Sequence, residues 1–407
     1  MLEGKNIVLA VTGSIAAYKT ANLASMLKKL HARVTVLMTE NAVNFINPIT
    51  FETLTGNKCL IDTFDRNFQY NVEHVSLAKE TDLVVVAPAS ANVIGKIANG
   101  IADDMLTTTI MACRCKKIIA PAMNTNMYLN PIVQENIEKL KRFDMEVITP
   151  ATGHLACGDD GIGKMPSEQV LLDYILREAA FEKDMAGKKV LVTAGPTMEK
   201  IDPVRFISNH STGKMGYAIA ENAMLRGAEV TLVTGRTSLA PPPFVKVINV
   251  ISAKDMFEAV KEHMDDQDII IKSAAVADYR PVNPADEKIK KKTDDMSIEL
   301  ERTDDILQYV GEHKKENQFV CGFSMETENM IENSRAKLEK KKADMIVANN
   351  LKQKGAGFGT DTNIVTFITK NNTEEKPVMQ KSQVAREILD YIMRLHKTGE
   401  SHKNEKN

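Results

Sequence analysis

Short apolar runs that end in glycine, serine or proline recur along the chain. The first covers residues 7–11, and residues 190–193 repeat its design behind a second Gly-Lys pair. Such a run, when it ends in a glycine turn, is typical of a buried parallel strand that leads into a ligand-binding loop. Because the chain makes this start twice, the pattern predicts two α/β domains, each with a site at the carboxyl end of its sheet.

The remaining apolar runs predict the other strands of two sheets. They cover residues 34–38, 83–87, 117–120 and 146–148 in the first half, and residues 229–234, 245–250, 268–272, 319–323, 345–348 and 364–368 in the second. Apolar residues at helical spacing predict helices over residues 18–30, 166–183 and 217–226. Strands that alternate with helices predict the α/β class, with two doubly wound, Rossmann-like domains.

Length and charge agree with this division. The chain has 407 residues, more than one ordinary core serves, and 43% of them are hydrophobic. We place the domains at residues 1–186 and 187–396, and we expect the polar tail, residues 397–407, to be disordered. The net charge of -2 disfavours nucleic acid or a membrane surface as the main partner, and no apolar run approaches the roughly 18 residues of a membrane span.

Cysteine usage indicates a reducing compartment. The chain has 5 cysteines, an odd number, and no Cys-x-x-Cys pair, so it predicts neither a disulfide framework nor a zinc site. The apolar stretch near the N-terminus is interrupted by Thr12, Gly13 and Ser14, and its pattern recurs inside the chain, so we do not interpret it as a signal peptide. A cytoplasmic location is therefore expected.

Loops that follow the first three strands form the first candidate site. Residues 13–16 are mostly small, which lets backbone N–H groups and the start of the next helix approach an anion. Thr39 follows the second strand, and residues 88–92 follow the third. The Gly-x-Gly-x-x-Gly fingerprint of dinucleotide-binding folds is absent, which disfavours an NAD-dependent oxidoreductase.

Three further residues of the first half carry candidate chemistry. His74 precedes a predicted helix, and a lone histidine is often structural or solvated. Asn124 follows the fourth strand, where its amide could hold a carboxylate or belong to a proline-bounded turn. Cys157 lies in residues 153–163, a segment so rich in glycine that we expect no regular structure there. Such a segment resembles a mobile active-site flap, the alternative being an exposed loop that carries a thiol.

Taken in order, these elements resemble the FMN-binding phosphopantothenoylcysteine decarboxylases. The resemblance implies a flavodoxin-like domain in which Asn124 holds the substrate carboxylate, His74 acts as base or orienting group, and Cys157 donates a proton. It implies FMN contacts from Gly13, Ser14, Ile15, Ala16, Thr39, Pro88, Ala89, Ser90 and Asn92. Tyr128 stands where the family often has tryptophan, a change that keeps an aromatic ring.

The second half carries three polar clusters. Residues 206–213 place small polar side chains before a helix, residues 274–280 follow a strand, and residues 288–291 are rich in lysine. A P-loop is rejected, because Ser208 stands where its first glycine belongs and Met215 where its magnesium-binding hydroxyl belongs. The lysine-rich cluster is interpreted either as a basic segment that closes over phosphates or as a solvated loop.

In this order the clusters resemble the phosphopantothenate–cysteine ligases that use CTP. With the first half, they make the chain similar to the bifunctional enzymes of coenzyme A biosynthesis. The resemblance implies nucleotide contacts from Ala274, Asp278, Lys288, Thr303, Asp304, Asp305, Ile306, Phe323, Lys337 and Lys341. It implies catalytic roles for Lys288 and for Asn209, which would act on an activated acyl intermediate. Mg²⁺ is implied too, with no ligands assigned.

This chain departs from the ligase pattern at two places. Residues 303–306 read Thr-Asp-Asp-Ile where the family usually has Asn-Pro-Asp-Ile. Ser324 and Met325 stand where two alanines are common. Both departures concern details of the nucleotide pocket.

The resemblance also implies the partners. They are 4'-phosphopantothenate, L-cysteine and CTP, which would be converted to 4'-phosphopantetheine, CO2, CMP and diphosphate by a large homo-oligomer built from decarboxylase trimers and ligase dimers. Two alternatives stay open, an FMN-dependent cysteine decarboxylase with a different substrate and a regulatory flavoprotein. The joint presence of His74, Asn124 and Cys157 disfavours the regulatory reading.

Overall fold

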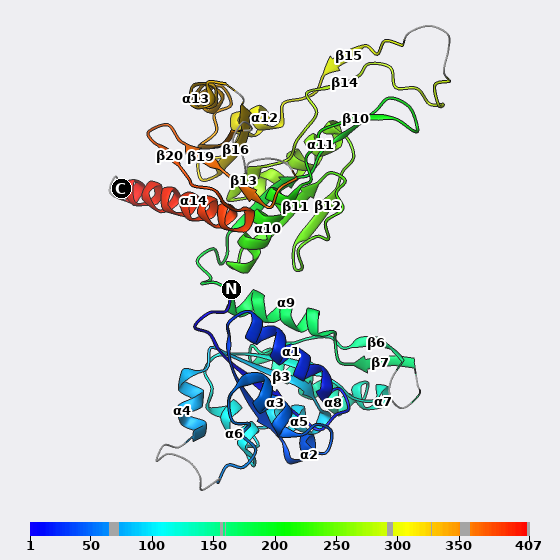
Figure 1. Cartoon of the computed structure of the whole chain (residues 1–407), viewed down its shortest axis with the longest axis vertical. Helices are drawn as coiled ribbons and strands as arrows, with labels where there is room; N and C mark the ends of the chain where they lie inside the picture. The colour runs from blue at the N-terminus through cyan, green and yellow to red at the C-terminus, as the bar shows by residue number, and fades with distance from the viewer. Residues whose placement is uncertain are drawn as a thin grey trace. The chain divides into compact units, whose positions relative to one another are not determined.

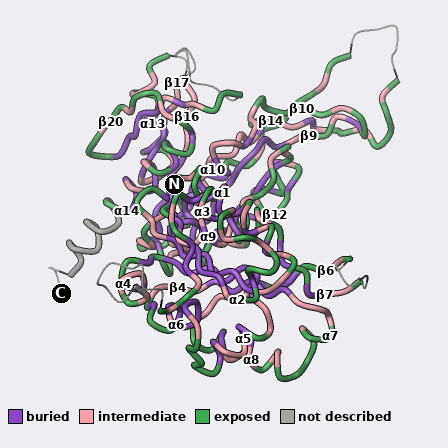
Figure 2. The backbone as a smooth tube through the Cα atoms, turned by 60° about the horizontal axis from the view of Figure 1, so that its bottom comes forward, coloured by how far each residue is buried: buried purple, intermediate pink, exposed green. Residues whose placement is uncertain are grey.

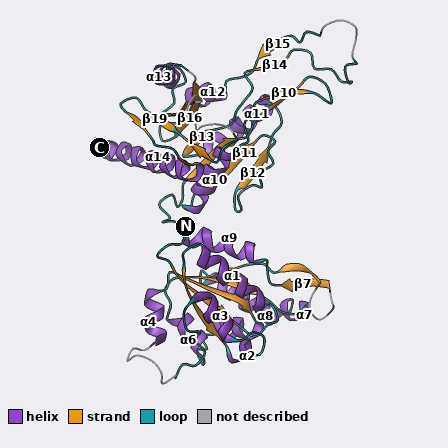
Figure 3. Ribbon diagram, viewed as in Figure 1, coloured by secondary structure: helices purple, strands orange, loops and turns teal. Residues whose placement is uncertain are grey.

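The chain forms two compact units, Met1–Glu182 and Lys183–Asn407 (Figure 1). The computed structural model describes residues 1–64, 73–154, 158, 160–290, 296–326, 328–350 and 359–404. Each unit is a mainly parallel sheet covered by helices, which confirms the predicted pair of doubly wound α/β domains (Figure 3).

The sheet of the first unit has the strand order β2-β1-β3-β4-β5, and all its pairings are parallel. The strands are β1 (Asn6–Val11), β2 (Arg33–Met38), β3 (Leu83–Ala89), β4 (Lys116–Pro121) and β5 (Glu146–Val147). This is the flavodoxin-like order, in which the chain changes direction between β1 and β3 and leaves a crevice at their carboxyl ends. The predicted loops at residues 13–16 and 88–92 flank that crevice.

Helices cover both faces of this sheet. They are α1 (Ala17–Lys29), α2 (Glu40–Val43), α3 (Pro48–Thr55), α4 (Glu73–Glu80), α5 (Ala91–Ala98), α6 (Met105–Ala112), α7 (Thr125–Tyr128), α8 (Pro131–Arg142) and α9 (Glu168–Ala179). In α1, Leu23 and Leu27 lie one turn apart and are fully buried, while Lys28 and Lys29 occupy the last turn, where cations favour the helix dipole. Burial, rather than helix propensity alone, therefore fixes the face that α1 turns to the sheet (Figure 2).

The glycine-rich segment around Cys157 corrects one expectation. Its two ends pair as an antiparallel hairpin of β6 (Ala151–His154) and β7 (Asp160–Lys164). Gly163 accepts a hydrogen bond from the amide of Met123 at 3.0 Å, and a Cβ on Gly161 would collide with Thr125. The glycines thus allow the hairpin to lie directly against the start of α7. Because glycine has a low strand propensity, the sequence pattern does not predict these strands.

The sheet of the second unit has the order β12-β11-β8-β13-β16-β17-β19-β20. The parallel strands are β8 (Lys189–Ala194), β11 (Glu229–Thr234), β12 (Lys246–Asn249), β13 (Ile269–Lys272), β16 (Phe319–Glu326) and β17 (Met345–Asn350), and β19 (Val365–Ile368) and β20 (Thr373–Glu375) extend the sheet in antiparallel pairings. The parallel part has the Rossmann order 3-2-1-4-5-6, so its ligand crevice is expected between β8 and β13.

Helices and short hairpins complete the second unit. The helices are α10 (Lys214–Leu225), α11 (Ala253–His263), η1 (Met264–Asp266), α12 (Ile306–His313), α13 (Met330–Lys340) and α14 (Lys381–Asn404). The short strand pairs are β9 (Met198–Lys200) with β10 (Phe206–Ser208), β14 (Tyr279–Pro281) with β15 (Leu300–Arg302), and β18 (Thr362–Asn363) with β21 (Met379–Gln380). The β14–β15 pair extends away from the sheet (Figure 1).

Helix α14 also departs from expectation. It packs beside α10 and continues to Asn404, so it enters the polar tail that the sequence analysis expects to be disordered. Val384, Ile388 and Ile392 form a fully buried stripe at helical spacing. Packing of this stripe stabilises the helix before the polar residues begin. Among the described residues, no helix is long and apolar enough to cross a membrane.

Candidate active sites

In the first unit, one buried hydroxyl joins the two loops of the crevice. The hydroxyl of Thr12, which is fully buried, donates to the carbonyl oxygen of Pro88 at 2.6 Å and accepts from the amide of Ser90 at 2.9 Å. The Thr20 hydroxyl donates to the carbonyl of Ala87 at 2.7 Å. The loops after β1 and β3 are therefore held in one arrangement by side chains that no water reaches.

Helix starts surround this crevice. No side chain caps α1 at Ala16, so the positive end of its dipole is left facing the loop at residues 13–16. Thr39 and Ser90, by contrast, cap α2 and α5 by accepting from the amides of Ala42 and Val93. Such a cradle of small residues at an uncapped helix fits the phosphate of FMN.

Packing explains the first glycine of this loop. A Cβ on Gly13 would lie 2.8 Å from the Cβ of Asn41, closer than carbon atoms pack. Glycine is thus needed for the loop after β1 to approach the start of α2. Ile15 is 59% exposed and Asn92 is also exposed, whereas Pro88 and Ala89 are buried at the end of β3.

The three predicted catalytic residues of the first unit lie on different elements. Asn124 caps α7, and its side-chain oxygen accepts from the amide of Asn126 at 2.8 Å. The neighbouring contact of Met123 with Gly163 brings Asn124 beside the β6–β7 hairpin. His74 lies half-buried in the first turn of α4. Cys157 lies outside the described residues.

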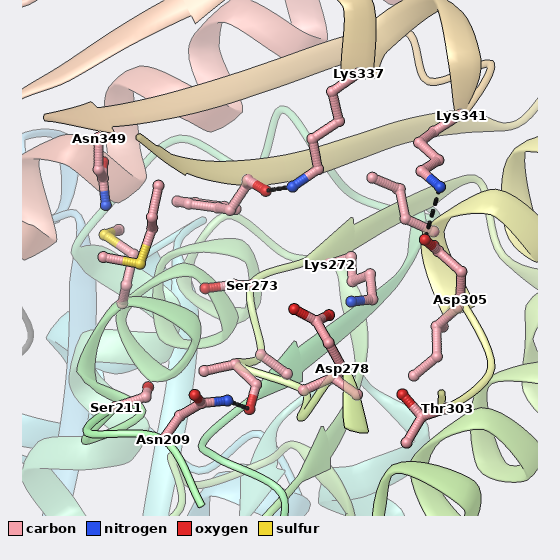
Figure 4. A pocket seen from close by; sticks show the side chains of 18 of the residues that line it. Asn209, Ser211, Lys272, Ser273, Asp278, Thr303, Asp305, Lys337, Lys341 and Asn349 are labelled. Carbon is pink, nitrogen blue, oxygen red and sulfur yellow. Dashed lines mark hydrogen bonds and ion pairs between the residues drawn. The ribbon is translucent and has the colours of Figure 1, made fainter. Parts of the chain in front are cut away.

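In the second unit, a pocket of about 760 Å³ opens at the carboxyl ends of β13, β16 and β17 (Figure 4). The predicted residues that line it are Asn209, Ala274, Asp278, Thr303, Asp304, Asp305, Ile306, Phe323, Lys337 and Lys341. They come from segments far apart in the sequence, and the sheet brings them together at one edge. Lys288 is not among the lining residues; it is exposed, on the chain between β14 and β15.

A chain of polar contacts shapes one wall of this pocket. Lys341 forms an ion pair with Asp305 at 2.7 Å, and Asp305 also caps α12 by accepting from the amide of Gln308 at 2.9 Å. Burial raises the pKa of Asp305, but the Lys341 ammonium and the Gln308 amide outweigh it, so the pKa lies below its ordinary value. Lys337 donates to the carbonyl of Phe323 at 3.0 Å, and burial lowers its pKa.

The loop after β13 is held from several sides. The Asn209 amide donates to the carbonyl of Ala275 at 3.0 Å, and the amide of Ala274 donates to the hydroxyl of Thr193 at 3.1 Å. The amide of Thr303 donates to the carbonyl of Asp278 at 3.0 Å. With its backbone held in this way, the loop presents the Asp278 carboxylate to the pocket (Figure 4).

The segment next to Lys288 is anchored outside the pocket. The amide of Ile289 donates to the Asp202 carboxylate at 3.2 Å, and Arg205 donates to the carbonyl of Ile289 at 3.0 Å. Arg205 and Asp202 also pair with each other at 2.5 Å. The backbone beside Lys288 therefore has a defined attachment to the turn between β9 and β10, although the lysine side chain is exposed.

Two features of the pocket escaped the sequence analysis. Lys272, at the end of β13, lines the pocket, although the sequence pattern marked it only as the last residue of a strand. Gly213 begins α10 at a φ of 79° without a side-chain cap, so the positive end of α10 also faces the pocket. The sequence did contain a signal for Lys272, because it is a charged residue directly after a run of isoleucines. The ends of parallel strands line the ligand crevice in such sheets.

Neither unit offers a preformed protein cage for a metal ion in the part of the chain that the structure describes. There, no group of three or more histidine, cysteine, aspartate or glutamate side chains lies close enough to hold one. Mg²⁺ that enters with a nucleotide keeps several waters and binds mainly to phosphate oxygens, so it needs no such cage.

Comparison with known proteins assigns both units. Residues 1–180 match the family model "Flavoprotein", and residues 185–395 match "DNA/pantothenate metabolism flavoprotein C-terminal domain". The coenzyme A biosynthesis bifunctional protein CoaBC of Bacillus subtilis is 47% identical over 405 residues, 98% of this chain and 100% of the relative. A cysteine/cysteine sulfinic acid decarboxylase from an unknown prokaryotic organism is 44% identical over 86% of this chain and 99% of its own.

Solved structures are also similar to this chain, and one of them is a separate C-terminal domain. It is the C-terminal domain of a coenzyme A biosynthesis bifunctional protein CoaBC, 47% identical, with a TM-score of 0.46; the match covers 53% of this chain and 100% of that domain. The two family models together cover nearly the whole chain, and the Bacillus subtilis relative matches it over 98% of its length. The chain therefore belongs to the family of bifunctional coenzyme A biosynthesis proteins, flavoproteins that carry a decarboxylase and a ligase on one polypeptide.

Proposed function

We propose that the second unit joins 4'-phosphopantothenate to L-cysteine at the expense of CTP, and that the first unit decarboxylates the product to 4'-phosphopantetheine. The observation that carries the proposal is the lysine-rich pocket at the switch point of the second sheet, in a chain whose first unit is a flavoprotein domain. A carboxylate is a poor electrophile, so it must be activated before an amine can attack it. A pocket that stabilises phosphate charge suits that activation.

The ligase reaction divides into two displacements. The substrate carboxylate attacks the α-phosphate of CTP, which forms an acyl-cytidylate and releases diphosphate. The cysteine amine then attacks the acyl carbon and displaces CMP. Lys337 and Lys341 stabilise the phosphate charge, and Asn209, whose amide is fixed on the loop after β13, orients the acyl group.

The remaining nucleotide contacts have separate tasks. Phe323 and the loop at residues 303–306 border the pocket beside Asp278, which contacts the nucleotide. Lys288 reaches the phosphates from the β14–β15 extension, and the anchored backbone of Ile289 limits the path it follows. Mg²⁺ accompanies CTP and shares the charge of its phosphates.

In the first unit, bound FMN would take two electrons from the substrate, which converts its thiol into a thioaldehyde that stabilises the carbanion left by CO2, and would return them after CO2 is lost. FMN would be held on one side of the crevice by Gly13, Ser14, Ile15, Ala16 and Thr39, and on the other side by Pro88, Ala89, Ser90 and Asn92. Asn124 holds the carboxylate, and His74 orients the substrate or accepts its proton. Cys157 would donate the proton that accompanies the return of the hydride from reduced flavin to the decarboxylated intermediate.

A second candidate rests on the relative named as a cysteine/cysteine sulfinic acid decarboxylase. On that alternative, the first unit would act on free cysteine and the second unit would bind another ligand. Full-length similarity to the bifunctional relative and the arrangement of the pocket favour the first proposal.

The test is product analysis by mass spectrometry. The purified protein is incubated with FMN, Mg²⁺, 4'-phosphopantothenate and cysteine, with CTP or ATP as the nucleotide. The proposal expects 4'-phosphopantetheine and CMP with CTP. Formation of AMP at an equal rate with ATP would contradict the nucleotide assignment, and failure to consume any nucleotide would contradict the ligase. We place the reaction in the cytoplasm and expect a homo-oligomer of decarboxylase trimers and ligase dimers, which light scattering tests.

A further inference from the structure

Lys272 lies at the carboxyl edge of the second sheet, beside its switch point. It is the last residue of β13, in register with Thr193 of β8 on one side and Gly322 of β16 on the other. The switch point of the sheet lies between β8 and β13, where ligands of such folds bind. Its side chain is half-buried and lines the pocket together with Asp278 (Figure 4).

The ammonium of Lys272 has no partner among the described residues. The other half-buried lysines of the pocket are paired: Lys214 with Asp361 at 2.6 Å, Lys341 with Asp305 at 2.7 Å, and Lys337 with the carbonyl of Phe323 at 3.0 Å. In the described part of the chain, no hydrogen bond or ion pair joins Lys272 to any group. A half-buried cation without a partner is costly, so a ligand anion is the missing partner.

We propose that Lys272 binds the triphosphate of the nucleotide and holds it across the switch point, opposite the uncapped start of α10. This inference rests on the proposed nucleotide-dependent ligase and adds a residue to its binding site. The start of α10 at Gly213 supplies backbone N–H groups on one side of the pocket, and Lys272 supplies a full charge at its centre.

The charged groups that face Lys272 set its response to pH. Burial lowers the pKa of Lys272 to about 8; Asp305 and Asp278 raise it, and Lys337 and Lys341 lower it further. These groups come from the start of α12, the loop after β13, and the end of α13. Binding of an anion requires the protonated lysine, so the affinity for CTP is expected to fall as the pH rises through about 8.

The experiment measures binding of CTP with Mg²⁺, and of cytidine, to the full-length FMN-loaded protein by calorimetry. Lys272→Met is expected to weaken CTP binding by at least about tenfold, the size of a lost charge-assisted hydrogen bond, and to change cytidine binding less than about twofold. Lys272→Arg is expected to restore most of the CTP affinity, because it restores the charge. Lys246→Met, at the amino end of the edge strand β12, is the matched control and leaves both affinities unchanged.

The pH profile gives an independent readout. Between pH 7 and pH 9, the CTP affinity of the wild type is expected to fall by up to about tenfold more than that of Lys272→Arg, because arginine stays protonated. Unchanged CTP affinity in Lys272→Met, an equal loss for CTP and cytidine, or a loss of kcat with CTP affinity intact would each overturn the inference. If the wild type binds neither CTP nor cytidine, the proposed nucleotide function itself is wrong. If the wild type binds CTP and Lys272→Met binds it equally well, only the inference about Lys272 is wrong.

Discussion

Single buried hydroxyls and ammonium groups organise both sites. Thr12 ties together the two loops of the crevice in the first unit, and Lys272 has no partner among the described residues that line the pocket of the second unit. The two side chains differ in one respect. The Thr12 hydroxyl both donates to and accepts from backbone groups, so it supports the structure. Lys272 has no partner among the described residues, which fits a role in ligand binding.

Thr12→Val tests the supporting role. The substitution keeps the shape but leaves the carbonyl of Pro88 and the amide of Ser90 without their hydrogen bonds. We expect the first unit to lose about 1–3 kcal/mol of stability and to retain less FMN. Flavin absorbance per protein after gel filtration measures retention. Thr12→Ser keeps the hydroxyl and should retain FMN like the wild type; equal retention by Thr12→Val would show that the bridge is dispensable.

Lys272→Met should stabilise the nucleotide-free protein, in contrast to its effect on binding. The pKa of Lys272 falls from an ordinary 10.5 to about 8 on folding, so the charged lysine opposes folding at pH 7. Replacement is expected to raise the stability of the second unit at pH 7 by about 1–3 kcal/mol.

The sign of the pH dependence follows from proton uptake. Between about pH 8 and 10.5 the unfolded state binds more protons than the folded state, so the wild type gains stability as the pH rises and the gap to the variant closes. Thermal unfolding of both proteins across this range measures the gap. A gap that is absent at pH 7, or one that widens toward pH 10, would contradict a half-buried, charged Lys272.

At the scale of elements, the start of α10 depends on close packing. A Cβ on Gly216 would lie 2.6 Å from the Cβ of Ala194 and 3.0 Å from the carbonyl oxygen of Thr193. The helix therefore lies against β8 with no room for a methyl group. Because Gly213 and Lys214 line the pocket one turn earlier, any shift of the helix moves the pocket wall.

Gly216→Ala is expected to cost about 1–3 kcal/mol and to weaken CTP binding, since the helix must move away from the sheet. Gly187→Ala is the control: its φ is 76° and nothing lies within 4 Å of the added Cβ, so it carries backbone strain without crowding. Calorimetric CTP titrations of both variants provide the comparison. Weaker binding in Gly187→Ala than in Gly216→Ala would be incompatible with packing as the cause.

The same elements show what sequence alone can predict. The central parallel strands were predictable because they are short apolar runs that are almost fully buried, whereas the edge strands β5 and β12 are only partly buried. The strand order places the predicted loops at one edge. The β6–β7 hairpin was not, because its glycines serve contacts with Met123 and Thr125, which are distant in sequence. The proposed role of Lys272 was not predictable either, because its place in the pocket and its lack of a partner among the described residues depend on the folded structure.

At the scale of the whole molecule, the two units repeat one architecture with different ligand sites. Each places a helix start without a side-chain cap beside a switch point, α1 in the first unit and α10 in the second. The product of the proposed ligase is the substrate of the proposed decarboxylase, so the chain should perform two consecutive steps. The central claim is that the second step requires the first.

The most direct measurement uses cysteine that carries a heavy-carbon label in its carboxyl group. The FMN-loaded protein receives this cysteine with Mg²⁺, and 4'-phosphopantothenate and CTP are added singly or together while labelled CO2 is followed by mass spectrometry. We predict labelled CO2 only when both are present, and none from cysteine alone. Release of labelled CO2 from cysteine without CTP would contradict the account and identify the first unit as a decarboxylase of free cysteine.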